Sequence, residues 1–108
     1  MSLSVERFLS FSEKAQLQTI KDLNDIGQEE MIIEALIAVG IENLSVPLLG
    51  ELGRAYNNND KPEEAIKVLN SIDEEYRDAV WHYRCAYSYG FIASNNNEAY
   101  TSDNMQHM

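Results

Sequence analysis

The sequence predicts an all-α fold of about five helices, arranged as antiparallel helix–turn–helix pairs. Strand signals are nearly absent, because the chain has no alternating runs of Val, Ile and Thr and no Asn-Gly or Asp-Gly hairpin turn. Apolar residues instead recur at three- and four-residue spacing behind residues that commonly cap helices. This pattern returns after about 34 residues, which is typical of stacked helical pairs.

Length and charge limit the kind of protein. The chain of 108 residues is long enough for one domain with a modest core. Its 18 acidic and 8 basic residues give a net charge of −10, which disfavours binding to nucleic acid or to an anionic membrane. No apolar run is long enough to span a membrane, and the N-terminal residues lack the pattern of a secretion signal. With Cys85 as the only cysteine, we expect a cytoplasmic protein.

Two helices are expected before residue 45. Ser10-x-x-Glu13 has the spacing of a capping box, in which two side chains satisfy backbone N–H groups of the first turn. Asp25-x-x-Gln28 is a second possible cap, and a strongly apolar stretch follows it. Gly40 is expected to end that second helix in a left-handed conformation.

The next two helices have clearer boundaries. Ser45-Val46-Pro47 reads as a helix start, because proline is tolerated in the first turn, and this helix should end near Asn57. The run Asn57–Asp60 predicts a turn. Asp60-x-x-Glu63 then caps a helix with one apolar face, made of Ala65, Ile66, Leu69 and Ile72.

A longer helix is expected over about residues 78–93. The polar run Ser94–Asn97 predicts another turn, after which a second helix would start near Glu98. Residues 101–108 are short and polar, and we expect them to fray.

The helix starts share one spacing. At a shift of 34 residues, Glu29–Ile32 falls on Glu63–Ile66, and the next shift reaches Glu98-Ala99-Tyr100. The preceding helices match at a shift of 33, where Leu52–Tyr56 falls on Cys85–Tyr89. A one-residue slip within a turn is easily absorbed, so the sequence indicates repeated helical pairs.

Leu52-Gly53, Tyr56, Ala65 and Leu69 resemble the tetratricopeptide repeat, a helix–turn–helix unit. The resemblance implies a short right-handed α-solenoid, in which Gly53 and Ala65 let two helices approach closely and Leu69 packs back against the first. The chain also resembles small bacterial tetratricopeptide-like proteins of unassigned function. The alternative is an unrelated antiparallel helical bundle.

This resemblance divides residues 1–108, read as a single domain. Residues 4–45 form degenerate N-terminal helices, and residues 46–78 form the best-matching repeat. Residues 79–100 form a truncated repeat, and the frayed tail follows.

Nothing in the sequence indicates an enzyme, and no cofactor is expected. His82 and Cys85 are three residues apart and could face one metal ion on a helix, but two ligands do not make a site. We therefore interpret Cys85 as a small core residue and His82 as structural. The five glycines are scattered and form no phosphate-binding loop.

The resemblance implies that the first helix of each pair lines a concave groove that binds a protein or peptide. Its predicted binding residues are Arg54, Asn57, Asn58, Tyr83 and Tyr87, and the same helix faces also place Gly50, Val80 and Gly90 along the groove. Asparagine can bind a peptide backbone, arginine can pair with a carboxylate, and the tyrosines would form an aromatic ledge. Two alternatives remain: the tyrosines pack between neighbouring units, and the asparagines only form a turn.

A second hypothesis is structural. The half-repeat at the C-terminus should leave Trp81, Tyr89 and Ile92 poorly covered. A homodimer formed through this open end would bury them. Trp81 is more simply explained as a residue that fixes one helical unit on the next.

Overall fold

The structure is a computed structural model that describes residues 4–107, with side chains over residues 4–95. That part of the chain contains six α-helices and two single 3₁₀ turns, and no strand. The all-α prediction is therefore confirmed. None of the described helices combines the length and apolarity needed to cross a membrane. The elements are α1 (Val5–Leu9), α2 (Glu13–Asp25), α3 (Glu29–Val39), η1 (Ile41–Asn43), α4 (Val46–Asn58), α5 (Pro62–Asn70), η2 (Glu74–Tyr76) and α6 (Ala79–His107).

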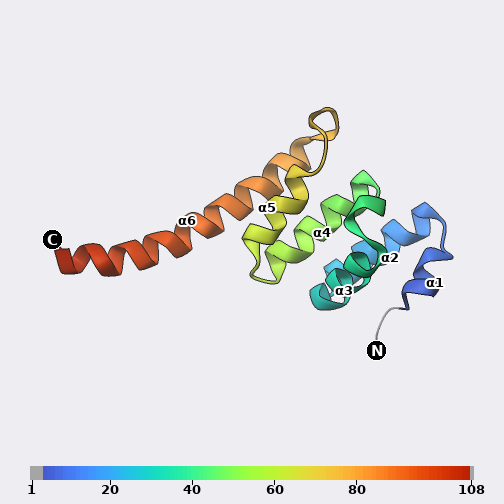
Figure 1. Cartoon of the computed structure of the whole chain (residues 1–108), viewed down its shortest axis with the longest axis horizontal. Helices are drawn as coiled ribbons and strands as arrows, with labels where there is room; N and C mark the ends of the chain where they lie inside the picture. Colours follow the sequence, from blue (N-terminus) through green and yellow to red (C-terminus); the bar gives the residue numbers. More distant parts are fainter. Residues whose placement is uncertain (1–3, 108) are drawn as a thin grey trace.

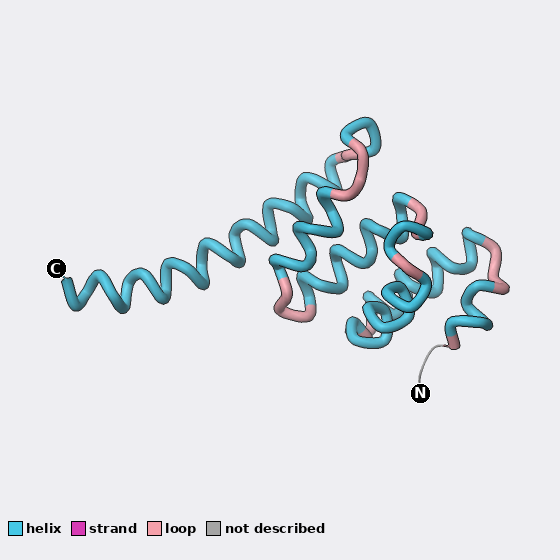
Figure 2. The backbone as a smooth tube through the Cα atoms, in the orientation of Figure 1, coloured by secondary structure: helices cyan, strands magenta, loops and turns pink. Residues whose placement is uncertain are grey.

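Helix α4 is the centre of the fold. It contacts α2 and α3 on one side and α5 and α6 on the other. Figure 1 shows α6 running beside α5 and then continuing past the body of the molecule to the C-terminus. The tube view in Figure 2 shows that short loops join each helix to the next.

The α4–α5 pair forms as predicted. Ser45 caps α4, where its Oγ accepts a hydrogen bond from the Leu48 N–H at 3.4 Å. A Cβ atom on Gly53 would lie 2.5 Å from Cδ2 of Leu69, so only glycine allows this approach of the two helices. Ala65 is fully buried on the facing side of α5. The predicted steric roles of these three α4–α5 residues are therefore confirmed.

One apolar core joins the N-terminal helices to α6. Its largest fully buried side chains come from α1 to α5, and Cys85 brings α6 into the same cluster. The expectation that Cys85 is a small core residue is confirmed. The most deeply buried members are Phe8, Ile20, Ile32, Leu36, Leu52 and Leu69.

The predicted caps of the N-terminal helices are wrong. The helix α1 was not expected; Ser10 ends it, and Ser12 caps α2 by accepting from the Ala15 N–H at 3.2 Å. The short extra helix turns Phe8 into the core, and this moves the start of α2 by two residues. Asp25 is the last residue of α2 and does not cap α3.

The turn after α4 also begins later than predicted. The helix runs through Asn58, and Asp60 adopts a left-handed conformation with φ of 60°. A residue in that conformation cannot cap the next helix, and α5 begins after Lys61 with no side-chain cap. Gly40 does take the expected positive φ, at 99°, after α3.

The turn predicted at Ser94–Asn97 is wrong as well. Helix α6 passes through these residues without a break, and its backbone continues through the segment expected to fray. No second helix therefore follows within residues 79–107. A returning helix would need apolar residues to bury. At a shift of 34 from Val68 and Leu69, the tail offers Ser102 and Asp103.

Candidate functional site

A hollow of about 380 Å³ lies between the C-terminal half of α4 and the first turns of α6. Its lining contains the five predicted binding residues together with Val80 and Arg84. Gly50 and Gly90, which the sequence also placed along the groove, line neighbouring hollows instead. The structure therefore brings together residues that lie up to 33 positions apart in the chain. The lining residues are Arg54, Asn57, Asn58, Val80, Tyr83, Arg84 and Tyr87.

The tyrosines form the exposed wall of this hollow. Tyr83 is 70% exposed and Tyr87 is 45% exposed, and the two lie one turn apart on α6. The ring of Tyr87 lies 6.4 Å from that of Phe91, which extends the aromatic surface along the helix. Side chains this exposed are not packed between helical units, which was the alternative interpretation of the two tyrosines.

Asn57 has a different position from the one expected of a ligand-binding residue. It is buried, and its Nδ2 donates to the Arg84 carbonyl oxygen at 3.1 Å. Its Oδ1 accepts from the Ser88 hydroxyl at 2.6 Å. Both ends of the amide thus hold α6 on α4. Asn57 shapes the wall, while the neighbouring Asn58 is exposed to the hollow.

Arg54 already has carboxylate partners within the chain. Its Nη2 lies 3.1 Å from Oδ1 of Asp25 on α2, and its Nη1 lies 3.5 Å from Oε1 of Glu51. Its side chain is only one third exposed. The guanidinium therefore ties α4 to α2, and its positive charge is largely balanced before any ligand arrives.

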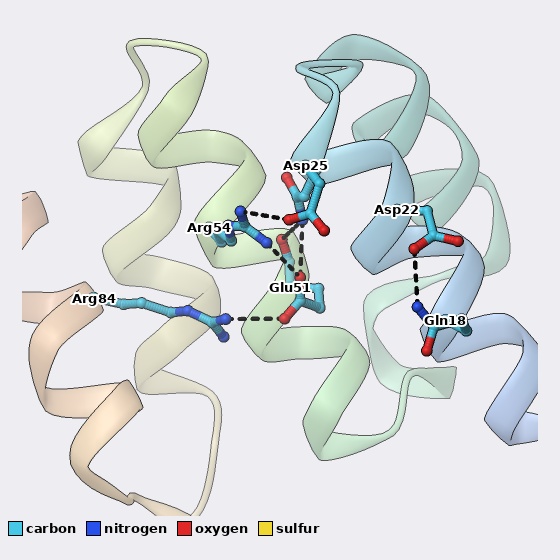
Figure 3. Close-up of polar contacts among 7 residues, drawn as sticks. Gln18, Asp22, Asp25, Glu51, Arg54 and Arg84 are labelled. Atoms are coloured by element: carbon cyan, nitrogen blue, oxygen red, sulfur yellow. Dashed lines mark hydrogen bonds and ion pairs between the residues drawn. The ribbon is translucent and has the colours of Figure 1, made fainter.

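The centre of this polar network is Glu51, whose side chain is 5% exposed. Its Oε2 accepts from Nη2 of Arg84 at 2.9 Å, and its Oε1 accepts from Nδ2 of Asn24 at 3.1 Å. Figure 3 shows the carboxylate between Arg54 and Arg84. One buried anion thus links α2, α4 and α6, and charge-assisted bonds of this kind are among the stronger ones in proteins.

Sequence reasoning missed Glu51 and Arg84. A signal was present, because Glu51 lies among the apolar residues of α4, between Gly50 and Leu52. Gly50 is a further signal, since a Cβ there would lie 2.8 Å from Nη1 of Arg84. The absent side chain leaves the space in which the arginine crosses α4 to reach the carboxylate.

A second hollow of about 290 Å³ adjoins the first. The two share Val80 and Arg84, and the second extends to Pro47 and Trp81. The Trp81 Nε1–H donates to the Leu69 carbonyl oxygen at 2.7 Å, and the Arg77 guanidinium lies over its ring. Trp81 thus fixes α6 on α5, as the sequence suggested. The two hollows therefore adjoin at Val80 and Arg84.

His82 and Cys85 do not converge on a common point. Cys85 faces the core, and its burial raises the pKa of the thiol, with a smaller opposing effect from Arg77. His82 is exposed and lies edge-on to Trp81, with ring centroids 4.9 Å apart. Among the residues whose side chains are described, no three His, Cys, Asp or Glu gather where they could hold a metal ion.

No protein-family model, curated protein or solved structure matches this chain. Function must therefore be inferred from the groove itself.

Proposed function

We propose that the chain is a non-catalytic interaction module of the tetratricopeptide type that binds an extended peptide in the groove between α4 and α6. The contacts of α4 with both α2 and α6 support this arrangement. In a stack of helical pairs, the first helices of successive pairs are neighbours and line the concave face. Helices α3 and α5 would then be the second helices of their pairs.

One observation carries the proposal. The five binding residues that the repeat pattern predicted line the same hollow. Two of them, Tyr83 and Tyr87, present aromatic surface that the described part of the chain leaves exposed. Tyrosines of this kind supply contact area at a low cost in conformational entropy, which is why they are enriched at protein interfaces.

The charges of the groove favour a neutral or basic peptide. Arg54 and Arg84 both pair with carboxylates of the chain, so the groove has little positive charge to offer an acidic ligand. The chain as a whole carries a charge of −10, which attracts basic segments and repels nucleic acid and anionic membranes. The peptide would pack an apolar side chain on the tyrosines and bond its backbone to the Asn58 amide.

A peptide-display selection against the purified chain tests this proposal. We expect enriched sequences with an apolar residue flanked by neutral or basic ones. In fluorescence anisotropy, Tyr83→Ala and Tyr87→Ala should each weaken binding of a selected peptide by roughly tenfold, equivalent to about 1.4 kcal/mol.

Tyr89→Ala is the matched control. Tyr89 is 56% exposed on the same helix but lies outside the groove lining, so its removal should leave affinity unchanged. The proposal fails if no sequence is enriched, or if the three tyrosine variants bind a selected peptide equally well.

A further inference from the structure

One face of α6 has no covering helix in the described structure. It consists of His82, Ala86, Tyr89 and Ala93, all of them exposed, and is called the bare face below. A second side of the helix packs on the body through Cys85 and Ser88. The groove tyrosines lie on a third, neighbouring side, and the two surfaces meet where Ala86 and Tyr87 line one hollow.

The equivalent face of α4 packs on α5, with Gly53 buried and Tyr56 partly buried. At the shift of 33 residues, Ala86 corresponds to Gly53 and Tyr89 corresponds to Tyr56. Gly53 lies directly against Leu69 of α5. The bare face is thus the position at which a second helix packs in the preceding pair.

Residues 98–107 lack the apolar positions of a helix that would cover this face. In α5 and the turn after it, the buried residues are Pro62, Ala65, Val68, Leu69 and Ile72. At the shift of 34 residues, the last three correspond to Ser102, Asp103 and Gln106. A fold-back helix would therefore bury a carboxylate and two other polar groups, and would keep only Ala99 of these positions as an apolar contact.

Charge identifies a second copy of the chain as the occupant. The segment Ala79–Asn97 contains no Asp or Glu, whereas the remainder of the chain carries all 18 acidic residues. Two copies of such an acidic protein repel each other at most surfaces, but not at this one. We propose that the bare faces of two copies pack together, with the two α6 helices antiparallel.

The spacing of the bare face supports the antiparallel direction. Its residues recur at intervals of four, three and four, which is the spacing of a two-helix seam. In an antiparallel pair, Ala86 of one copy faces Tyr89 of the other, and Ala93 faces His82. Each layer then combines a small side chain with a large one. A parallel pair would place Tyr89 on Tyr89 and leave alanines facing each other.

The dimer should be weak. Twelve residues of helix span only about 18 Å, so one α6–α6 seam buries far less than the roughly 800 Å² per partner of a standard interface. Sedimentation equilibrium should therefore show a monomer at about 10 µM and a mass approaching that of a dimer near 1 mM.

Substitutions of equal charge locate the contact. Ala86→Glu and Tyr89→Glu each place a carboxylate in the seam and should raise the dissociation constant at least tenfold. Tyr83→Glu adds the same charge to the same helix on the groove side and should leave the dimer intact. The three positions are exposed, so circular dichroism should show unchanged folding.

Cysteine cross-linking determines the direction. In the antiparallel pair, equivalent residues at position 82, or at position 93, are separated by about 16 Å along the axis. His82→Cys and Ala93→Cys proteins should therefore form an intermolecular disulfide when mixed, and not when oxidised separately. The native protein is the control, because Cys85 is buried.

A strict monomer at 1 mM would overturn the proposal, as would a dimer that Tyr83→Glu disrupts as strongly as Ala86→Glu does. Disulfides formed by each cysteine variant alone would overturn the antiparallel direction. Peptide binding is tested separately, through Tyr83 and Tyr87 on the neighbouring side of α6.

Discussion

Helices α4 and α6 occupy equivalent positions in the predicted repeat but differ in how they are covered. Eight of the thirteen residues of α4 are buried, whereas in residues 79–95 of α6 only Cys85 and Ser88 are. The difference is the second helix: α5 packs on α4, and nothing described packs on the equivalent face of α6. Replacing a small residue at a repeat position should therefore destabilise the fold only where a neighbouring helix packs against that residue.

The largest effect is expected from replacing an alanine in the covered α4–α5 pair and comparing it with an alanine on the bare face of α6. Ala65→Arg puts a long, charged side chain at a fully buried position of α5. Overpacking costs about 1–3 kcal/mol and the unpaired buried charge adds to it, so we expect a loss of at least about 3 kcal/mol. Urea denaturation, followed by circular dichroism, measures the change.

Ala86→Arg is the control, because Ala86 is exposed on the bare face of α6. At low micromolar protein concentration its free energy of unfolding should change by less than about 0.5 kcal/mol. Equal losses in the two variants would mean that α6 is packed as tightly as α5. An unchanged midpoint for Ala65→Arg would contradict the close approach of α4 and α5.

A smaller effect is expected at the polar network that joins α4 to α6. Glu51→Gln removes the buried negative charge and leaves Arg84, whose side chain is 17% exposed, without a carboxylate partner. We expect a loss of about 1–3 kcal/mol in thermal or urea unfolding.

Asp25→Asn provides the exposed counterpart. Asp25 pairs with Arg54 from the surface, where its side chain is 64% exposed, so the loss should stay below about 1 kcal/mol. Similar losses in both variants would show that the Glu51 carboxylate is no more important than a surface ion pair.

The sequence predicted the parts of the fold that depend on neighbouring residues. The start of α4 follows from Ser45 and Pro47. The close contact between α4 and α5 follows from Gly53 and Ala65, because small residues at these positions let two helices approach. These features are local, or repeat at a fixed period, so one sequence is enough to find them.

Some local predictions failed, among them the caps at Ser10, Asp25 and Asp60. The polar network was missed because it depends on contacts between distant helices. The bonds from Asn57 to Ser88 and from Glu51 to Arg84 join residues 31 and 33 positions apart, and their geometry depends on how α6 is rotated against α4. The turn at Ser94–Asn97 was predicted from its polar residues alone. A polar run forms a turn only when the chain beyond it can bury apolar surface.

The third test compares two glycines. Gly53→Ala places a methyl group 2.5 Å from the Leu69 side chain, and the overpacking should exceed the gain in helix propensity, for a net loss of about 1–2 kcal/mol. Gly90→Ala meets no atom within 4 Å and should stabilise the chain by up to about 1 kcal/mol. Changes of the same sign in the two variants would contradict the difference in covering.

The smallest expected effect is a pH dependence from Cys85, the residue through which α6 enters the core. Burial raises the pKa of its thiol above the ordinary value of 9.0, while Arg77 lowers it to a smaller extent. The folded chain therefore favours the neutral thiol. This contribution to stability is complete below the unfolded pKa and is lost as the pH rises from there through the folded pKa.

Urea denaturation between pH 8 and pH 10 should accordingly show stability falling more steeply in the native chain than in Cys85→Ala. The substitution itself shifts stability by a constant amount, so the slopes are compared, not the midpoints. The window ends at pH 10 because Tyr56, whose pKa is raised first by burial and then by Glu64, begins to contribute above its ordinary value of 10.0. Parallel slopes would mean that the thiolate is tolerated in the folded state, and hence that α6 does not hold Cys85 in the core as firmly as α5 holds Ala65.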